Sequence, residues 1–348
     1  MILDDTERIN ELDPQGMVDD LDTFPEQCKE AVSIGEAARI PFNLNEFERA
    51  FVTGMGGSAI VGDILSRLLD FPVETNRGYH LPRTARSDDL LIAISYSGNT
   101  EETLSALRDG RRRGMKTLCL ATGGKMESYC IRESIPLVKI PTGHQPRAST
   151  GYMLFPLLEL FDEAGLAGTI NFDRLLEKIE DLADKWNSSV PVPENEPKQL
   201  AVDFADRIPI IYGTKGNTKV VAYRWKTQIN ENAKQPAFWN VFPELNHNET
   251  VGYQLGSKLM ENGKVILLEN GLDFERNELR MKIMEDLFKD ENIDYGKATA
   301  PEGDKFTKII GQIYFGDYFS VYLALLNEVD PSPVKLIESF KSRLKEEG

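Results

Sequence analysis

Short apolar runs alternate with longer amphipathic stretches through the first half of the chain. The runs "AFVTGM" (50–55) and "DDLLIAI" (88–94) predict buried strands, and each is followed by apolar residues at helical spacing. Strands alternating with helices predict a parallel sheet with crossover helices on both faces. The other strands expected in this half are at 73–76, 116–122 and 135–141, and the helices are at 59–69, 100–114 and 151–165.

A second alternation of the same kind follows a polar, proline-rich segment, "VPVPENEPKQ" (190–199). This segment predicts a linker between a unit at 1–190, which includes a lead-in helix, and a unit at 200–348. The fold class expected is therefore α/β, with two parallel sheets flanked by helices and a helical C-terminus. The "YGTKGNT" turn (212–218) resembles the Gly-rich turns of the first half, which suggests a duplication at the level of the fold.

The stretch "ISYSGNTEETL" (94–104) places three hydroxyl residues, Ser95, Ser97 and Thr100, between a strand and a helix. Asn99 is the expected N-cap, with Glu102 at capping-box spacing. The unpaired N–H groups and the dipole of a helix N-terminus favour an anion at such a turn. Ser, Asn and Thr are also ordinary capping residues, so a purely structural role stays open.

A similar turn lies upstream, in "GMGGSAIVGD" (54–63). Gly56 and Gly57 allow a ligand to approach the backbone, and Ser58 adds a hydroxyl. The spacing is not that of the dinucleotide fingerprint, and no Gly-Lys-Ser/Thr of a P-loop follows. Two such turns without a nucleotide motif point to a small phosphorylated ligand.

Composition narrows the class of protein. The chain has 348 residues and a formal net charge of −16, which disfavours binding to nucleic acid or to an anionic membrane. No apolar run approaches the roughly 18–20 residues of a membrane helix. Three cysteines without framework or zinc spacing suggest reduced thiols in a cytoplasm and no metal site.

Acid–base chemistry could come from the second half of the chain. Glu231 lies near the end of a predicted helix that Pro236 stops, and His247 lies in the polar turn "PELNHNE". A carboxylate and an imidazole suit proton transfer near neutral pH. A solvated surface glutamate and an ordinary turn histidine remain the alternatives, and His80 and His144 are expected to be loop residues without a role.

Several of these motifs together carry a family resemblance. The two Gly/Ser turns resemble the sugar isomerase (SIS) domain, which binds phosphosugars. Nearly the whole chain resembles the bifunctional phosphoglucose/phosphomannose isomerases of archaea and some bacteria, through "GGSA", "SYSGNTEET", "RAS", "NENAK", "ELNHNE" and "DPSPVKLIESFK". The resemblance implies two SIS subdomains, phosphosugar binding at 1–190 and catalytic residues at 200–348. It also implies a homodimer whose active site lies between subunits, with the histidine supplied by the partner chain.

The resemblance further implies an aldose–ketose isomerase acting on glucose 6-phosphate and mannose 6-phosphate. Glu231 would shuttle a proton between C2 and C1 through a cis-enediol(ate), His247 would open the sugar ring, and Arg147 would stabilise the negative charge of the intermediate. The sugar phosphate would be held by the two turns, through Gly56, Gly57, Ser58, Ser95, Ser97 and Thr100. The hydrogen moves as a proton, so no metal or other cofactor is expected.

Two assignments in the C-terminal segment are less direct. The resemblance implies a lysine that assists ring opening, for which Lys341 aligns best and Lys335 is the competitor. It also implies a small hydroxyl residue where ordinary glucose-phosphate isomerases carry glutamine, and Ser332 is a nearby candidate.

Two other functions are compatible with SIS motifs. A non-catalytic phosphosugar sensor would usually carry a basic helix-turn-helix, and residues 1–45 do not have that composition. An isomerase half of a glucosamine-phosphate synthase would need an amidotransferase domain with an N-terminal nucleophile, whereas this chain begins "MILDD".

Overall fold

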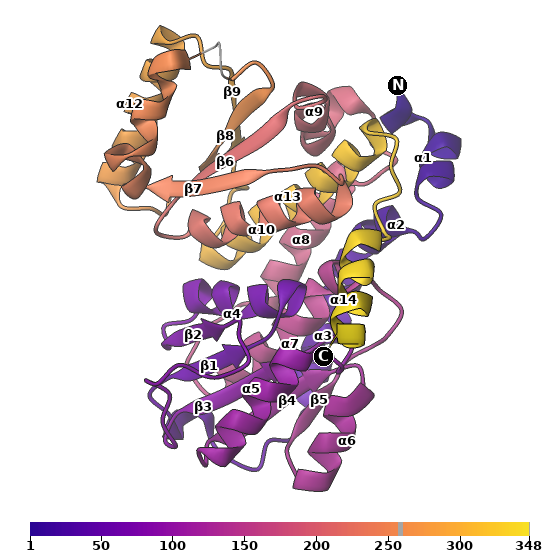
Figure 1. Cartoon of the computed structure of the whole chain (residues 1–348), viewed down its shortest axis with the longest axis vertical. Helices are drawn as coiled ribbons and strands as arrows, with labels where there is room; N and C mark the ends of the chain where they lie inside the picture. Colours follow the sequence, from indigo (N-terminus) through magenta and orange to yellow (C-terminus); the bar gives the residue numbers. More distant parts are fainter. Residues whose placement is uncertain (257–259, 348) are drawn as a thin grey trace. The chain divides into compact units, whose positions relative to one another are not determined.

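The computed structural model describes residues 1–256 and 260–347, which form two compact units (Figure 1). The β1–β5 unit comprises Asp22–Ala183 and Pro301–Gly311. The β6–β9 unit comprises Met1–Leu21, Asp184–Ala300 and Gln312–Gly348. Each unit contains one parallel sheet flanked by helices, which confirms the predicted α/β fold class. Helices α2 (Met17–Asp22), α8 (Phe172–Trp186) and α13 (Lys305–Leu326) have residues in both units.

The sheet of the β1–β5 unit has the strand order β2-β1-β3-β4-β5, and every neighbouring pair is parallel. Its strands are β1 (Ala50–Thr53), β2 (Val73–Asn76), β3 (Leu90–Ile94), β4 (Lys116–Ala121) and β5 (Leu137–Lys139). Its helices are α3 (Phe24–Ala37), α4 (Gly56–Leu68), α5 (Glu101–Arg112), α6 (Gly124–Glu133) and α7 (Thr150–Glu163).

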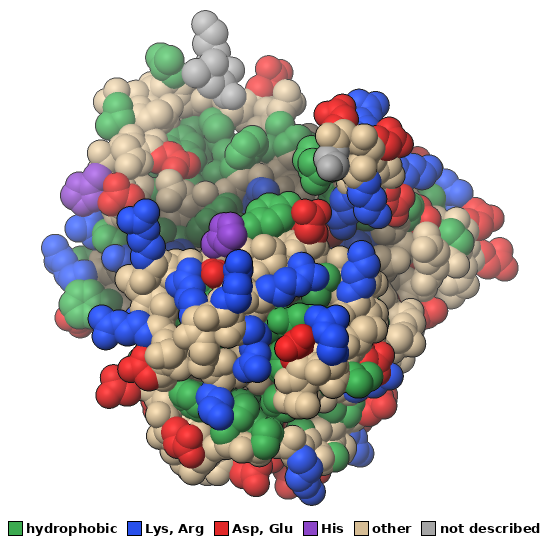
Figure 2. Space-filling model, turned by 60° about the horizontal axis from the view of Figure 1, so that its bottom comes forward, with side chains coloured by type: hydrophobic (Ala, Val, Ile, Leu, Met, Phe, Trp, Pro, Cys, Tyr) green, Lys and Arg blue, Asp and Glu red, His purple; other side chains and the backbone are tan. Residues whose placement is uncertain are grey.

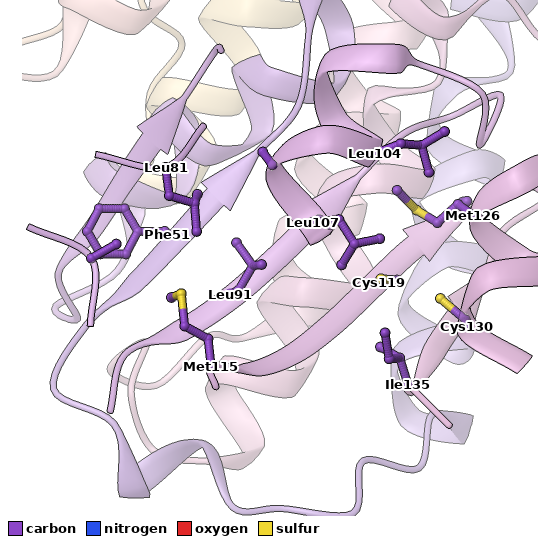
Figure 3. Close-up of a cluster of buried hydrophobic side chains, with 14 residues drawn as sticks. Phe51, Leu81, Leu91, Leu104, Leu107, Met115, Cys119, Met126, Cys130 and Ile135 are labelled. Carbon is purple, nitrogen blue, oxygen red and sulfur yellow. The ribbon is translucent and has the colours of Figure 1, made fainter. Parts of the chain in front are cut away.

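The central strand β3 is apolar throughout, as expected where helices cover both faces of a sheet. All five residues of β3 are buried. On one face Phe51, Leu91 and Cys119 pack with side chains of α5 and α6 (Figure 3). On the other face α4 approaches so closely that a Cβ at Gly62 would lie 2.8 Å from Cβ of Val52. The periodicity that predicted these strands therefore reflects burial on both sides.

The sheet of the β6–β9 unit has the strand order β7-β6-β8-β9 and is also parallel. Its strands are β6 (Ile208–Thr214), β7 (Phe238–Phe242), β8 (Gly263–Glu269) and β9 (Tyr295–Thr299). Its helices are α1 (Thr6–Leu12), α9 (Glu196–Asp203), α10 (Thr218–Asn232), α12 (Glu275–Asp290) and α14 (Lys335–Glu347).

Helix α13 is the core helix of the β6–β9 sheet. Trp225 of α10 stacks on Phe315 with ring planes 2° apart, and a Cβ at Gly316 would lie 1.9 Å from Nε1 of Trp225. By length and hydropathy α13 is the one helix, among the residues described, that could cross a membrane. Its most apolar window is 94% buried inside the protein, as expected for a core helix.

The two sheets share one connectivity. Strand β6 pairs with β7 and β8 as β1 pairs with β2 and β3, and β8 pairs with β9 as β3 pairs with β4. This order supports the duplication suggested by the sequence. The turns after β6 and β8 therefore correspond to the turns after β1 and β3.

Candidate active site

The two Gly/Ser turns lie side by side in the β1–β5 unit. Strands β1 and β3 are paired in parallel, so the turns that follow Thr53 and Ile94 leave the same edge of the sheet. A hydrogen bond joins them, because the backbone N–H of Tyr96 donates to Oγ of Ser58 at 3.2 Å. The structure thus brings together the two segments that the sequence predicted to hold a phosphate.

The hydroxyl groups of these turns have different surroundings. Ser95 is fully buried and its Oγ donates to Oγ1 of Thr100 at 3.1 Å. Ser58 is also buried. Ser97 is exposed, and its Oγ accepts a hydrogen bond from the backbone N–H of Asn99 at 3.2 Å. Ser97 and the half-buried Thr100 are therefore the hydroxyls of these turns that reach the surface.

Asn99 is not the N-cap of α5, so that prediction is wrong. The helix begins at Glu101 after Thr100, whose side chain makes no capping hydrogen bond. The Asn99 side chain instead makes one hydrogen bond within its own turn and one to another segment. Its Nδ2 donates to the carbonyl of Ser97 at 2.9 Å, and its Oδ1 accepts from the N–H of Lys125 at 3.1 Å. The side chain thus ties the turn after β3 to the start of α6.

Arg147 lies against the first of the two turns. It belongs to a 3-10 turn, Pro146–Ala148, and is only 4% exposed. A Cβ on Gly57 would lie 2.9 Å from the carbonyl oxygen of Pro146 and 3.3 Å from Cα of Arg147. Gly57 therefore permits a backbone contact between α4 and the arginine segment. Gly56, at φ +51°, faces open space.

Gln27 of α3 also holds the arginine segment, and the sequence did not reveal this role. Its Nε2 donates to the carbonyl of Ala148 at 3.0 Å, and its Oε1 accepts from the N–H of Tyr152 at 3.3 Å. The side chain is 3% exposed. No local pattern could reveal this role, because the partners lie more than a hundred residues along the chain.

Glu231 is half-buried in the last turn of α10, in the β6–β9 unit. A buried polar stripe on the same helix bonds to α13. Arg224 donates to both carboxylate oxygens of Asp317 at 3.0 and 2.6 Å, and Gln228 donates to the same carboxylate at 2.9 Å. Asn232, next to Glu231, donates to Oγ of Ser320 at 2.9 Å. These bonds have defined directions, so they fix the rotation of α10 about its axis and the position at which the helix carries Glu231.

The end of α10 is joined to the segment before α14. Lys234 has the left-handed backbone conformation (φ +57°), and its Nζ donates to the carbonyl of Glu231 at 2.5 Å and to that of Pro331 at 2.8 Å. Ser332 follows in this segment and is 1% exposed. Lys335 and Lys341 lie on α14, where no residue is buried. Glu231 is thus tied to the segment that leads into the helix bearing both candidate lysines.

His247 is exposed at the end of a 3-10 turn, Glu244–His247, that follows β7. Glu249, two residues on, accepts hydrogen bonds from Asn240 and Tyr212, and the Tyr212 and Tyr253 hydroxyls are 2.5 Å apart. Burial raises the pKa of Tyr253 to about 12 and raises that of Tyr212 as well. Both tyrosines stay protonated at neutral pH and can donate, so the loop carrying His247 is anchored to the sheet.

The surface charge is unevenly distributed. The formal net charge is −16, yet Lys and Arg side chains gather on the face drawn in Figure 2. A local concentration of positive side chains can attract an anionic ligand even when the net charge of the protein is negative.

Two family models match the chain. Residues 43–128 match the SIS domain, and residues 193–344 match the bacterial phospho-glucose isomerase C-terminal SIS domain. A bifunctional phosphoglucose/phosphomannose isomerase of Caldicellulosiruptor bescii is 39% identical over 95% of this chain and 99% of its own length. The chain belongs to this isomerase family.

Other relatives agree with that assignment. A protein of the same name from Thermoplasma acidophilum is 34% identical over 87% of this chain and 92% of its own. Among solved structures, a hypothetical protein of Thermus thermophilus superposes with a TM-score of 0.75 at 16% identity, covering 95% of this chain and 90% of that one. At that identity the likeness supports the fold alone, and the family membership rests on the sequence relatives.

We expect Gly57→Ala to lower the free energy of unfolding by about 1–3 kcal/mol, because the added methyl group would overlap backbone atoms of Pro146 and Arg147. Helix propensity alone predicts that the substitution raises the free energy of unfolding, by up to about 1 kcal/mol. Urea denaturation of the variant and the wild type decides between them. A stabilised variant would show that α4 and the arginine segment are not in contact.

Proposed function

We propose that this protein interconverts glucose 6-phosphate and mannose 6-phosphate with fructose 6-phosphate. The observation that carries the proposal is 39% identity to a bifunctional isomerase over 95% of the chain. The position of Arg147 against the first Gly/Ser turn supports it, because an isomerase needs a cation near a substrate held by its phosphate. No feature of the described residues favours the sensor function over it.

The substrate phosphate would be held by the two turns of the β1–β5 unit. Backbone N–H groups at the starts of α4 and α5 are donors for phosphate oxygens, and the dipoles of both helices favour a dianion there. Ser97 and Thr100 would add their hydroxyls, while Ser58 and Ser95 would act mainly by holding the turns in place. Gly56 and Gly57 would leave room for the ligand at the first turn.

Proton transfer would be carried out by side chains of the β6–β9 unit. His247 opens the sugar ring with the help of a lysine, Lys341 in preference to Lys335. Glu231 then removes the proton from C2 of the open-chain aldose and delivers it to C1, which produces the ketose through a cis-enediol(ate). The guanidinium of Arg147 stabilises the negative charge that develops on the oxygens of the intermediate. Aldose and ketose have the same oxidation state overall, so the reaction as proposed uses no redox cofactor.

Activity on mannose 6-phosphate requires access to the other face of C2. Rotation about the C2–C3 bond of the enediol(ate) would provide it, and a small side chain near C2 would leave space for that rotation. Ser332 is our candidate, since it lies in the segment that Lys234 joins to the end of α10, beside Glu231.

We also propose that the active protein is a cytoplasmic homodimer, with His247 supplied by the partner chain. Helix α14 supports a dimer, because Leu336, Phe340 and Leu344 form an apolar stripe that is 88%, 66% and 49% exposed. A stripe of this kind on a charged helix is typical of an interaction surface. The division into a phosphosugar-binding part (1–190) and a catalytic part (200–348) belongs to the same proposal.

The test of the activity is a coupled assay of purified protein that follows fructose 6-phosphate. We expect turnover of both aldose phosphates by the wild type. Glu231→Gln should lower kcat by on the order of 10²–10⁴-fold, since the amide cannot accept the C2 proton, and should leave the affinity for 6-phosphogluconate nearly unchanged.

Glu275→Gln, at an exposed position of the same unit, is the control for loss of one carboxylate. Turnover by Glu231→Gln at the wild-type rate would remove Glu231 from its role. Turnover of glucose 6-phosphate alone would reject the mannose activity. Binding of 6-phosphogluconate without any turnover in the wild type would favour the sensor.

Gln27→Leu is expected to lower kcat about tenfold or more with little change in KM, because the Arg147 turn loses its hydrogen bond to α3 at Ala148, and the start of α7 loses the bond at Tyr152. Steady-state kinetics of the variant gives both constants. Val32→Ala truncates a buried side chain on the same helix, so it should lower the free energy of unfolding and leave kcat unchanged. Equal losses of kcat in the two variants would mean that Gln27 acts only through stability.

Phe340→Asp is expected to give monomers and to abolish activity, because a charge would be placed in the centre of the apolar stripe of α14. Light scattering after gel filtration measures the mass. Ser342→Asp adds the same charge two residues away, outside the stripe, and should leave the dimer intact. A dimeric Phe340→Asp variant would exclude α14 from the interface.

A further inference from the structure

The β6–β9 unit repeats the two-turn arrangement of the β1–β5 unit. The turn between β6 and α10 corresponds to the one that carries Gly57, and the turn between β8 and α12 corresponds to the one that carries Ser97. One close backbone contact recurs in both units, although the second turn is one residue longer. A Cβ on Gly54 would lie 3.0 Å from the carbonyl carbon of Ser58, and a Cβ on Gly213 would lie 3.0 Å from that of Thr218.

The second pair of turns is joined by a carboxylate. One oxygen of Asp273, from the turn after β8, accepts the backbone N–H of Asn217 at 2.9 Å. Its other oxygen is 3.4 Å from Oγ1 of Thr218, the first residue of α10. Asn217 also donates its Nδ2 to the carbonyl of Leu272 at 3.1 Å, which fixes the turn that bears Asp273. A backbone N–H and a hydroxyl at a helix start are the groups that would bind a phosphate oxygen.

The approach of this carboxylate requires a glycine. A Cβ on Gly216 would lie 2.3 Å from Oδ1 of Asp273, well inside the closest contact that a real side chain tolerates. Because Gly216 has no side chain, the carboxylate can reach the backbone of the turn. Glycines in phosphate-binding turns allow a phosphate to approach in the same way.

The space beside this contact is acidic. A cavity of about 230 Å³ adjoins Thr214 at the end of β6 and Asn270 after β8, and its lining includes the carboxylates of Glu269, Asp273 and Glu278. Lys297 offsets the charge of Glu269 at 3.2 Å, so a phosphate dianion entering here would be repelled mainly by Asp273 and Glu278, where water screens charges less than in bulk.

We propose that Asp273 is an internal anion that occupies the second pair of turns in place of a ligand phosphate, so that each chain binds hexose phosphate at the first pair alone. The location of the first site rests on the proposed function. The role of Asp273 rests on the contacts with Asn217, Thr218 and Gly216, and is tested separately.

The first experiment counts ligands. Isothermal titration with 6-phosphogluconate should give one equivalent per wild-type chain. Asp273→Gly removes the internal anion and should add a weaker second equivalent, also visible as broadening of the ³¹P signal of inorganic phosphate at millimolar concentration. Asp206→Gly, an exposed position at φ +61° in the same unit, is the control for loss of one negative charge and should keep one equivalent.

The second experiment tests the contact itself. Gly216→Ala should lower the melting temperature in the wild-type background, because the methyl group displaces the carboxylate, and should have little effect in the Asp273→Gly background. Two equivalents in the wild type, no second equivalent in Asp273→Gly, or equal effects of Gly216→Ala in both backgrounds would each overturn the proposal.

A third variant separates this proposal from the proposed function. Ser97→Glu places a carboxylate at the first pair of turns. In the wild-type background it should abolish the tight binding of 6-phosphogluconate. In the Asp273→Gly background it should abolish the tight binding and leave the weaker binding at the second pair of turns. If Ser97→Glu binds as tightly as the wild type, the first pair of turns is not the phosphate site. The role of Asp273 is still decided by the two preceding experiments.

Discussion

The parallel pairing of β1 with β3 is the constraint on which the phosphate-binding region depends. Parallel strands in register end at the same edge of a sheet, so the turns that follow Thr53 and Ile94 must lie next to each other. Once they are adjacent, the hydrogen bond from Tyr96 to Ser58 can form, and it joins two segments that are distant in sequence. The pairing of β6 with β8 has the same consequence in the other unit, where the groups at the turns are a carboxylate and its donors.

The sequence was sufficient for the sheet of the β1–β5 unit and for the existence of the turns. Continuous apolar runs such as 90–94 are buried on both faces and give an unambiguous strand signal. Strands β7 (Phe238–Phe242) and β9 (Tyr295–Thr299) were not predicted. Only Phe242 is buried in β7, and β9 has only Ala298 buried and contains Gly296. The cap at Asn99 was mispredicted for a different reason. Its partners include Lys125, at the start of a helix that follows the next strand, and local spacing carries no information about such a contact.

The same limit applies to the residues that support the candidate site. Gln27 and Arg224 are buried polar side chains within helices, and from sequence alone each is a polar position with no evident partner. Only the fold shows that Gln27 bridges Ala148 and Tyr152, and that Arg224 pairs with Asp317. Sequence motifs therefore locate the groups proposed to touch substrate, while the side chains that orient them depend on contacts between distant segments.

The two units position their candidate groups in different ways, and the difference suits the chemistry proposed for each. Phosphate binding needs many weak donors at fixed positions, and the β1–β5 unit supplies backbone N–H groups held by strand pairing and by the close contact at Gly57. A general base needs one side chain with a fixed direction. In the β6–β9 unit the buried pair of Arg224 and Asp317 prevents rotation of α10, because any rotation would leave an uncompensated charge in the core. The position of Glu231 on α10 therefore depends on this ion pair, which can specify geometry even where its net contribution to stability is small.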